Sequence, residues 1–169
     1  RGLPALTLSL HMVFSGNPGT GKTTTLNAII SLYEKKGETV MLAAPTGRAA
    51  KRISDLTGKE AKTIHRLLEV SYDAGGRLVF KHNENDPLEC DVLVIDEMSM
   101  VDILIFESLL RSLKLSCRLV MVGDSDQLPS VGAGNVLCDL LAFDGFASVR
   151  LNEIFRQAQQ SQIVVNAHN

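Results

Sequence analysis

Residues 16–23 read Gly-Asn-Pro-Gly-Thr-Gly-Lys-Thr and match the pattern G-x-x-x-x-G-K-[ST] at every fixed position. An apolar run over residues 8–14 precedes this segment and predicts a buried strand. After it, apolar residues recur at the spacing of one helix face, and they are Leu26, Ile29, Ile30 and Tyr33. A glycine loop between a strand and a helix is the context that the pattern requires. We therefore expect a phosphate-binding loop rather than a glycine-rich turn without a ligand.

The chemistry of such a loop assigns a role to each residue type in it. Glycines let backbone N–H groups turn toward phosphate oxygens, and the start of the following helix adds partial positive charge. Lys22 is expected to reach the β- and γ-phosphates of ATP, and the Thr23 hydroxyl to coordinate Mg²⁺. The residues of this segment expected to bind the nucleotide are Gly16, Asn17, Pro18, Gly19, Thr20, Gly21, Lys22, Thr23 and Thr24.

Composition places the chain among ordinary globular proteins. Its 169 residues are 45% hydrophobic and 21% charged, which predicts a single domain over residues 1–169. The absence of a long apolar run and of a secretory signal predicts a cytoplasmic protein that makes no membrane contact. Three scattered cysteines favour reduced thiols over a disulfide frame or a metal site. The net charge of −2 gives no global attraction to nucleic acid, but it leaves a local basic patch open.

Strand and helix patterns alternate along the chain. Further apolar runs at residues 39–44, 92–95, 118–122 and 147–151 predict strands. Helical spacing falls between them, at Phe106, Leu109, Leu110 and Leu113 and again at Val136, Leu137, Leu140 and Leu141. The alternation predicts an α/β fold, a three-layer P-loop NTPase domain with a mostly parallel central sheet. Residues 71–87 interrupt the rhythm and predict a surface excursion with a short hairpin.

Two polar segments follow predicted strands. Asp96 and Glu97 end the run at residues 92–95, where Asp96 would hold Mg²⁺ opposite Thr23 and Glu97 would act as general base toward water. A solvated acidic turn is the alternative. Gln127 follows the next strand and can touch the γ-phosphate, although without the other motifs a plain turn would be the favoured interpretation. Ser99, with Asp102 three residues later, can cap the next helix.

The segments beyond the loop resemble the motifs of RecD-like superfamily 1 DNA helicases, in the order of that family. Motif Ia is similar to residues 44–52, its following segment to 63–68, motif II to 95–102, motif III to 122–132, motif IV to 151–157 and the helix downstream to 163–169. The match covers roughly residues 22–169 and is specific as a set.

The resemblance implies the first RecA-like motor domain of an ATP-dependent helicase, which moves 5′ to 3′ along single-stranded DNA in DNA repair or recombination. The ligands it implies are ATP, Mg²⁺ and single-stranded DNA; it does not identify protein partners. In the family, Gln127 senses the γ-phosphate and Arg156 contacts it, so the expected catalytic residues are Lys22, Glu97, Gln127 and Arg156. The DNA path is expected along Pro45, Thr46, Arg48, Thr63 and His65.

Ordinary structural roles compete with several of these assignments. Arg48, Lys51 and Arg52 cluster on a short helix whose apolar side is expected to be Ala49, Ile53 and Leu56. That cluster is either a DNA-facing patch or a solvated helix face. His65 is more often a packed or capping residue than a functional one, and Arg156 is an ordinary helix residue unless the family match holds.

Two departures from the family lead to alternatives. The first 25 or so residues look more like an AAA+ ATPase, so a chimera or designed chain and a second function, remodelling of protein partners, stay open. A non-enzymatic nucleotide-binding module is a third possibility. The chain also stops after motif IV, without the second motor domain, which suggests an excised piece. We expect that piece to hydrolyse ATP slowly and not to unwind duplex alone, because a single domain has no interdomain cleft to close.

Overall fold

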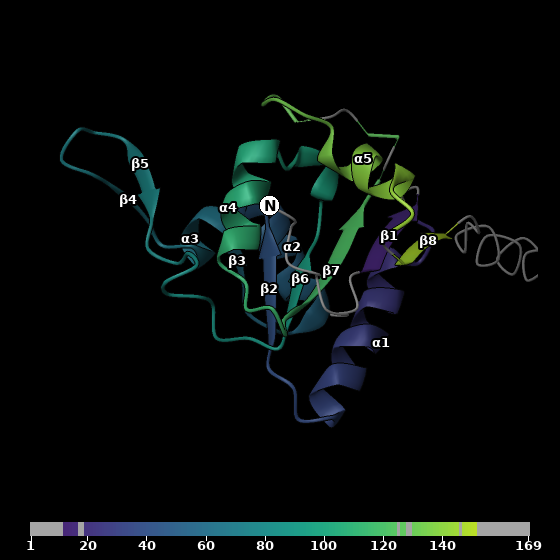
Figure 1. The fold of residues 1–169 in the computed structure, drawn as a ribbon. Helices are drawn as coiled ribbons and strands as arrows, with labels where there is room; N and C mark the ends of the chain where they lie inside the picture. Colours follow the sequence, from purple (N-terminus) through teal and green to yellow (C-terminus); the bar gives the residue numbers. More distant parts are fainter. Residues whose placement is uncertain (1–11, 17–18, 125, 128–129, 146, 152–169) are drawn as a thin grey trace, which may run out of the picture.

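The structure, a computed structural model, describes residues 12–16, 19–124, 126–127, 130–145 and 147–151 (Figure 1). Within these ranges the strands are β1 (Met12–Gly16), β2 (Val40–Ala44), β3 (Ala61–Thr63), β4 (Val70–Tyr72), β5 (Leu78–Phe80), β6 (Val92–Ile95), β7 (Arg118–Gly123) and β8 (Ala147–Leu151). The helices are α1 (Lys22–Lys35), α2 (Gly47–Thr57), α3 (Ile64–Leu67), the 3-10 turn η1 (Met98–Met100), α4 (Ile103–Arg111) and α5 (Val136–Ala142).

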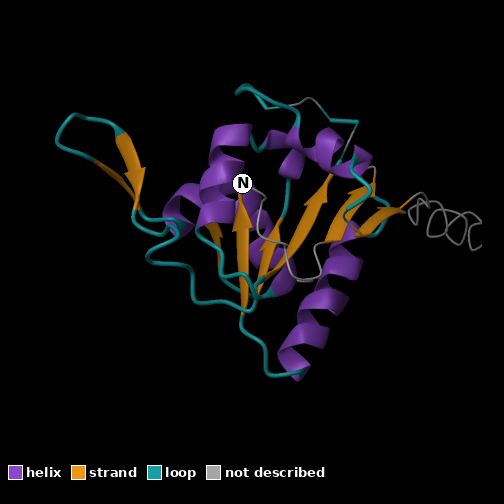
Figure 2. Cartoon of the chain, in the orientation of Figure 1, coloured by secondary structure: helices purple, strands orange, loops and turns teal. Residues whose placement is uncertain are grey.

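Six strands form one sheet in the order β3-β2-β6-β7-β1-β8, and every neighbouring pair is parallel (Figure 2). The predicted α/β fold is therefore confirmed, with one strand, β7, between the loop strand β1 and the acidic strand β6. Because all six strands run the same way, their carboxyl ends lie at one edge of the sheet. The loop, both polar segments and the expected DNA segments follow these ends.

Helices cover both faces of the sheet, because alternate side chains of each strand point to opposite sides. On β6, Leu93 and Ile95 lie in a cluster that includes residues of α3, α4 and α5. Val92 and Val94 lie in a second cluster, with residues of α1 and α2. Burial on both faces explains why the central strands read as unbroken apolar runs.

Three details differ from the expected elements. Strand β3 was not predicted, since three residues with the sequence Ala-Lys-Thr carry no apolar run. Helix α4 ends at Arg111, before Leu113, and although Phe106 and Leu109 are buried, Leu110 is 45% exposed. The expected burial of Leu56 on α2 was also wrong, because that side chain is 48% exposed. Both helices bury a narrower stripe than their sequence spacing indicates.

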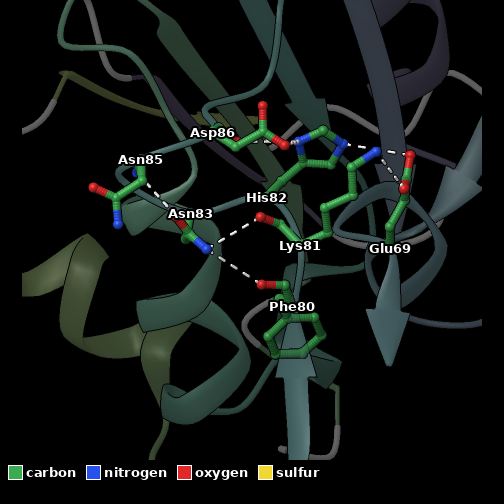
Figure 3. Close-up of polar contacts among 7 residues, drawn as sticks. All are labelled: Glu69, Phe80, Lys81, His82, Asn83, Asn85 and Asp86. Atoms are coloured by element: carbon green, nitrogen blue, oxygen red, sulfur yellow. Dashed lines mark hydrogen bonds and ion pairs between the residues drawn. The ribbon is translucent and has the colours of Figure 1, made fainter. Parts of the chain in front are cut away.

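The predicted hairpin is present as the antiparallel pair β4 and β5, which projects away from the sheet (Figure 1). Polar contacts fix its base, as Figure 3 shows. Lys81 Nζ donates to Glu69 Oε2 at 2.8 Å, and His82 Nδ1 lies 3.3 Å from Asp86 Oδ2. Asn83 Nδ2 donates to the carbonyl of Lys81 at 3.1 Å. The first contact ties the residue after β5 to the residue before β4, and the other two hold the turn at residues 81–86 that follows the hairpin.

The start of α4 is capped by a different residue from the one predicted. Asp102 is the N-cap, and its Oδ1 accepts a hydrogen bond from the Ile105 amide at 2.9 Å. Ser99 lies in η1, and its buried hydroxyl has no hydrogen-bond partner among the described residues. The expectation that Ser99 caps this helix was therefore wrong, because Ser99 lies within the short turn η1 and Asp102 directly precedes the first residue of α4.

Candidate nucleotide site

The glycine loop joins β1 to α1 in the conformation that its glycines permit. Gly19 and Gly21 have φ values of 88° and 85°, in the left-handed region that side chains with a Cβ disfavour. Gly21 is the N-cap of α1, so the backbone turns directly into the first helical residue, Lys22. At Gly16 a Cβ would lie 2.6 Å from Thr20 Oγ1 and 2.8 Å from the carbonyl oxygen of Leu151. Asn17 and Pro18 lie outside the described residues.

The lysine at the end of the loop turns back toward the start of the loop. Lys22 Nζ donates a hydrogen bond to the carbonyl of Gly16, across the loop from its own helix. Thr20 is buried, Thr23 is half-buried in the first turn of α1, and Thr24 is exposed. The lysine amine is thus held against the loop, where a phosphate oxygen can replace the Gly16 carbonyl as the acceptor of its hydrogen bond.

Asp96 and Glu97 follow β6 with an unusual backbone. Asp96 Oδ1 accepts a hydrogen bond from the Glu97 amide at 2.9 Å. Glu97 itself has φ 56° and ψ 42°, a left-handed conformation that is uncommon for a residue with a side chain. Such strain persists only where the surrounding structure imposes it, and it gathers at functional sites.

Burial dominates the electrostatics of this acidic pair. It raises the pKa of Asp96 above the ordinary value, while the Glu97 amide and the charges of Arg52 and Lys22 act in the opposite direction. Burial also raises the pKa of Glu97, assisted by the negative charges of Asp96 and Asp124. The positive charge of Lys22 lowers the pKa of both carboxyls, in keeping with the position of the glycine loop and the acidic pair at the same sheet edge. A glutamate with a raised pKa suits a general base.

Two residues that the sequence pattern did not indicate join the site. Arg52 Nη1 on α2 lies 3.2 Å from Glu97 Oε1. Asp124, directly after β7, is 2% exposed, and its Oδ1 accepts a hydrogen bond from the Asp126 amide at 3.0 Å. Neither was predicted for this site, although Arg52 was named in the basic cluster on the same helix. The Arg52–Glu97 contact spans 45 residues, which leaves no trace in local spacing.

The third segment is only partly placed. The amide of Gln127 donates to the carbonyl of Asp124 at 3.2 Å, so the residue follows β7 closely, and its side chain is exposed. Residues 125, 128 and 129 lie outside the described part of the chain, as does Arg156. The proximity of Gln127 and Arg156 to a γ-phosphate therefore stays a prediction.

The residues expected along DNA begin two helices at the same sheet edge. Thr46 Oγ1 caps α2 by accepting from the Ala49 amide at 3.2 Å, and Thr63 Oγ1 caps α3 by accepting from the Arg66 amide at 3.2 Å. Arg48 is exposed on α2, while Pro45 is half-buried just before it.

His65 on α3 packs against the hairpin. Its ring lies 6.0 Å from that of Phe80, tilted by 56°. The half-buried ring is therefore engaged at this contact, as the packed alternative expects.

The donor set fits a magnesium–nucleotide complex. No group of three or more His, Cys, Asp or Glu able to hold a metal occurs within the described ranges. Mg²⁺ does not require one, because it binds through one or two carboxylates together with substrate phosphates and water. Thr23 and Asp96 supply oxygen ligands of the preferred kind. Among the described helices, none is long and apolar enough to span a membrane.

Comparison with known proteins assigns the family. The AAA domain family matches residues 5–133 without interruption, across the loop, the acidic pair and the segment between them. The chain is 41% identical over 157 residues to the ATP-dependent RecD2 DNA helicase of Deinococcus radiodurans, covering 93% of this chain and 21% of that protein. It is 38% identical over 172 residues to the RecBCD enzyme subunit RecD of Mycolicibacterium smegmatis, covering 86% of this chain and 31% of that protein.

A solved helicase structure is similar to this chain in fold and in sequence. The crystal structure of Bacteroides sp Pif1 in complex with ADP-AlF4 superposes with a TM-score of 0.60 at 29% identity, over 88% of this chain and 39% of that one. The chain thus spans about a fifth to a third of the length of these curated relatives. One family match spans the loop and the segments that resemble motifs Ia, II and III, which favours a single origin over a chimera. The chain belongs to the AAA domain family, and the resemblance of its motifs to RecD-like superfamily 1 DNA helicases is confirmed.

Proposed function

We propose that this chain is the ATP-hydrolysing motor domain of a 5′ to 3′ DNA helicase that moves along single-stranded DNA. The observation that carries the proposal is the placement of the glycine loop with Lys22 and of the acidic pair Asp96 and Glu97 at the carboxyl ends of parallel strands, at one edge of the sheet. The names of the relatives, an ATP-dependent DNA helicase among them, support the same function.

Each residue of the site has a role in this proposal. Lys22 and the loop amides bind the β- and γ-phosphates of ATP. Thr23 and Asp96 hold Mg²⁺, which when bound neutralises charge on the phosphates. Glu97 orients water and accepts its proton, a contribution of about 10²- to 10⁴-fold in rate. Gln127 and Arg156 are proposed to contact the γ-phosphate.

The DNA path is proposed along the starts of α2 and α3. Thr46 and Thr63 each cap one of these helix starts. The two starts lie beside each other because Ala44 and Thr63 are paired in register on neighbouring strands. The exposed Arg48 supplies positive charge there, which phosphate contacts require.

The test is ATP hydrolysis and single-stranded DNA binding by the 169-residue chain. We expect slow hydrolysis, no duplex unwinding, and measurable binding of a labelled oligothymidine that weakens when salt is added. Arg48→Ala should weaken that binding; Thr46→Ala is a poorer probe, because it also removes a helix cap. A remodelling ATPase would bind no DNA through this face, so equal DNA binding by the parent and Arg48→Ala contradicts the proposal.

A further inference from the structure

The ion pair between Arg52 and Glu97 connects the proposed DNA face to the proposed general base. Arg52 lies on α2, whose first turn carries Arg48, and Glu97 follows β6. The two side chains meet at 3.2 Å between Arg52 Nη1 and Glu97 Oε1. None of the roles assigned above uses this contact.

The two partners differ in exposure. The Arg52 side chain is 62% exposed, whereas that of Glu97 is only 19% exposed. The guanidinium therefore reaches from solvent onto a carboxylate that the fold holds in place. An exposed ion pair of this kind contributes little net free energy, so a competing anion can take the guanidinium at small cost.

DNA phosphate is such a competitor. Arg48 and Arg52 are four residues apart on one helix, so they share a face one turn apart. A phosphate backbone that contacts Arg48 thus continues toward Arg52. A guanidinium also binds phosphate in a bidentate manner, which a lysine amine does not reproduce.

We propose that Arg52 is a positioning residue that holds Glu97 in the DNA-free chain and releases it when single-stranded DNA phosphate takes the guanidinium. This inference rests on the proposed function. While the pair persists, one carboxylate oxygen of Glu97 is occupied and the side chain is turned toward α2. Its release frees that oxygen for water. Because Glu97 and DNA phosphate compete for the same guanidinium, DNA binding and hydrolysis become coupled.

This competition for Arg52 can be tested by DNA affinity alone, without measuring ATP turnover. The affinity of the chain for a fluorescein-labelled oligothymidine is measured by anisotropy for the parent, Glu97→Gln, Arg52→Ala and the double variant. Glu97→Gln should tighten binding about two- to fivefold, the range of an exposed ion pair, because it frees Arg52 for phosphate. In the Arg52→Ala background the same change should leave affinity unaltered.

Glu107→Gln is the matched control. It removes one negative charge from an exposed ion pair with Arg111 on α4, and it should leave DNA affinity unchanged. Equal tightening by Glu97→Gln with and without Arg52 would reveal a general charge effect and overturn the inference. So would the absence of any tightening.

Hydrolysis without DNA supplies a second readout. Arg52→Ala should raise kcat in the absence of DNA and leave the KM for ATP unchanged, whereas Arg52→Lys should lie between Arg52→Ala and the parent. Arg111→Ala, with a guanidinium of similar exposure, should change neither constant. If Arg52→Ala lowers kcat instead, Arg52 assists Glu97 and the inference fails. If the parent binds no DNA at all, both the proposed function and this inference fail. If the parent binds DNA but the effects of Glu97→Gln and Arg52→Ala on affinity simply add in the double variant, only the ion-pair inference fails.

Discussion

At the scale of single residues, Gly16 shows how little space the loop leaves. A Cβ there would meet the hydroxyl of Thr20 and the backbone of Leu151 at less than 3 Å, and backbone cannot move away cheaply. Glycine is therefore required at position 16 by the close approach of neighbouring atoms and not by backbone conformation, because Gly16 is not among the residues with positive φ.

Gly16→Ala should lower the free energy of unfolding by about 1–3 kcal/mol, the usual cost of forcing a methyl group into packed surroundings. Denaturant unfolding measures it. Gly47→Ala is the control, because nothing lies within 4 Å of the place that its methyl group would take and alanine is the better helix former. Equal stability of Gly16→Ala and the parent would contradict the packing described here.

Asp96 is a half-buried carboxyl that the proposed function requires and that stability does not. Burial raises the pKa of Asp96, so the folded chain binds that proton more tightly than the unfolded chain. The free energy of unfolding therefore falls as pH rises from the unfolded pKa through the folded one.

Asp96→Asn should accordingly raise the melting temperature at neutral pH in the absence of Mg²⁺, while it abolishes hydrolysis. The asparagine side-chain oxygen can still accept the hydrogen bond that the Glu97 amide donates to Asp96. The gain should shrink in acid, where the parent carboxyl is protonated in both states. A gain that is independent of pH would show that charge burial is not its cause.

Glu97→Gln tests the proposed base directly. It should reduce ATP hydrolysis by about 10²- to 10⁴-fold, because the amide cannot accept the proton of water. Nucleotide affinity should change little. Hydrolysis by purified Lys22→Ala serves as the background: activity that survives both substitutions belongs to a contaminant.

At the scale of elements, α4 begins where Asp102 caps it, and the loop after β7 packs on that cap. A Cβ at Gly132 would lie 2.6 Å from Asp102 Oδ2, and the Ile103 amide donates to the carbonyl of Ala133 at 3.1 Å. The cap thus anchors part of the segment that follows motif III.

Asp102→Ala should cost about 1 kcal/mol, the usual value of a lost N-cap, and lower the melting temperature by about 2–4 °C. Ser99→Ala removes a buried hydroxyl that has no partner among the described residues, and it should cost less or even stabilise the chain. Thermal melts of both variants measure the difference. A larger drop in melting temperature for Ser99→Ala than for Asp102→Ala would show that Ser99, and not Asp102, caps α4.

The elements that could be predicted from sequence are those with strong local signals. The four buried strands and α1 follow from apolar runs and helical spacing. Strand β3 could not be predicted, because its three residues, Ala-Lys-Thr, carry no apolar run. The end of α4 was misplaced, because Leu113 continues the helical spacing beyond the helix.

At the scale of the whole molecule, parallel strands explain the site. Each motif follows a strand end, so six strands that run the same way bring separate segments to one edge. The acids and the lysine were predictable because their motifs are local. Arg52 and Asp124 were not, because only the three-dimensional packing of α2 and β7 beside β6 brings them to Glu97.

The most direct test of this convergence is the effect of Mg²⁺ on the affinity for a fluorescent ATP analogue. In the parent, Mg²⁺ should tighten binding; Thr23→Val and Asp96→Asn should each lose that gain, and the double variant should lose no more than either single one. If each single variant keeps the full gain from Mg²⁺, Thr23 and Asp96 do not share a metal, and the site described here is wrong.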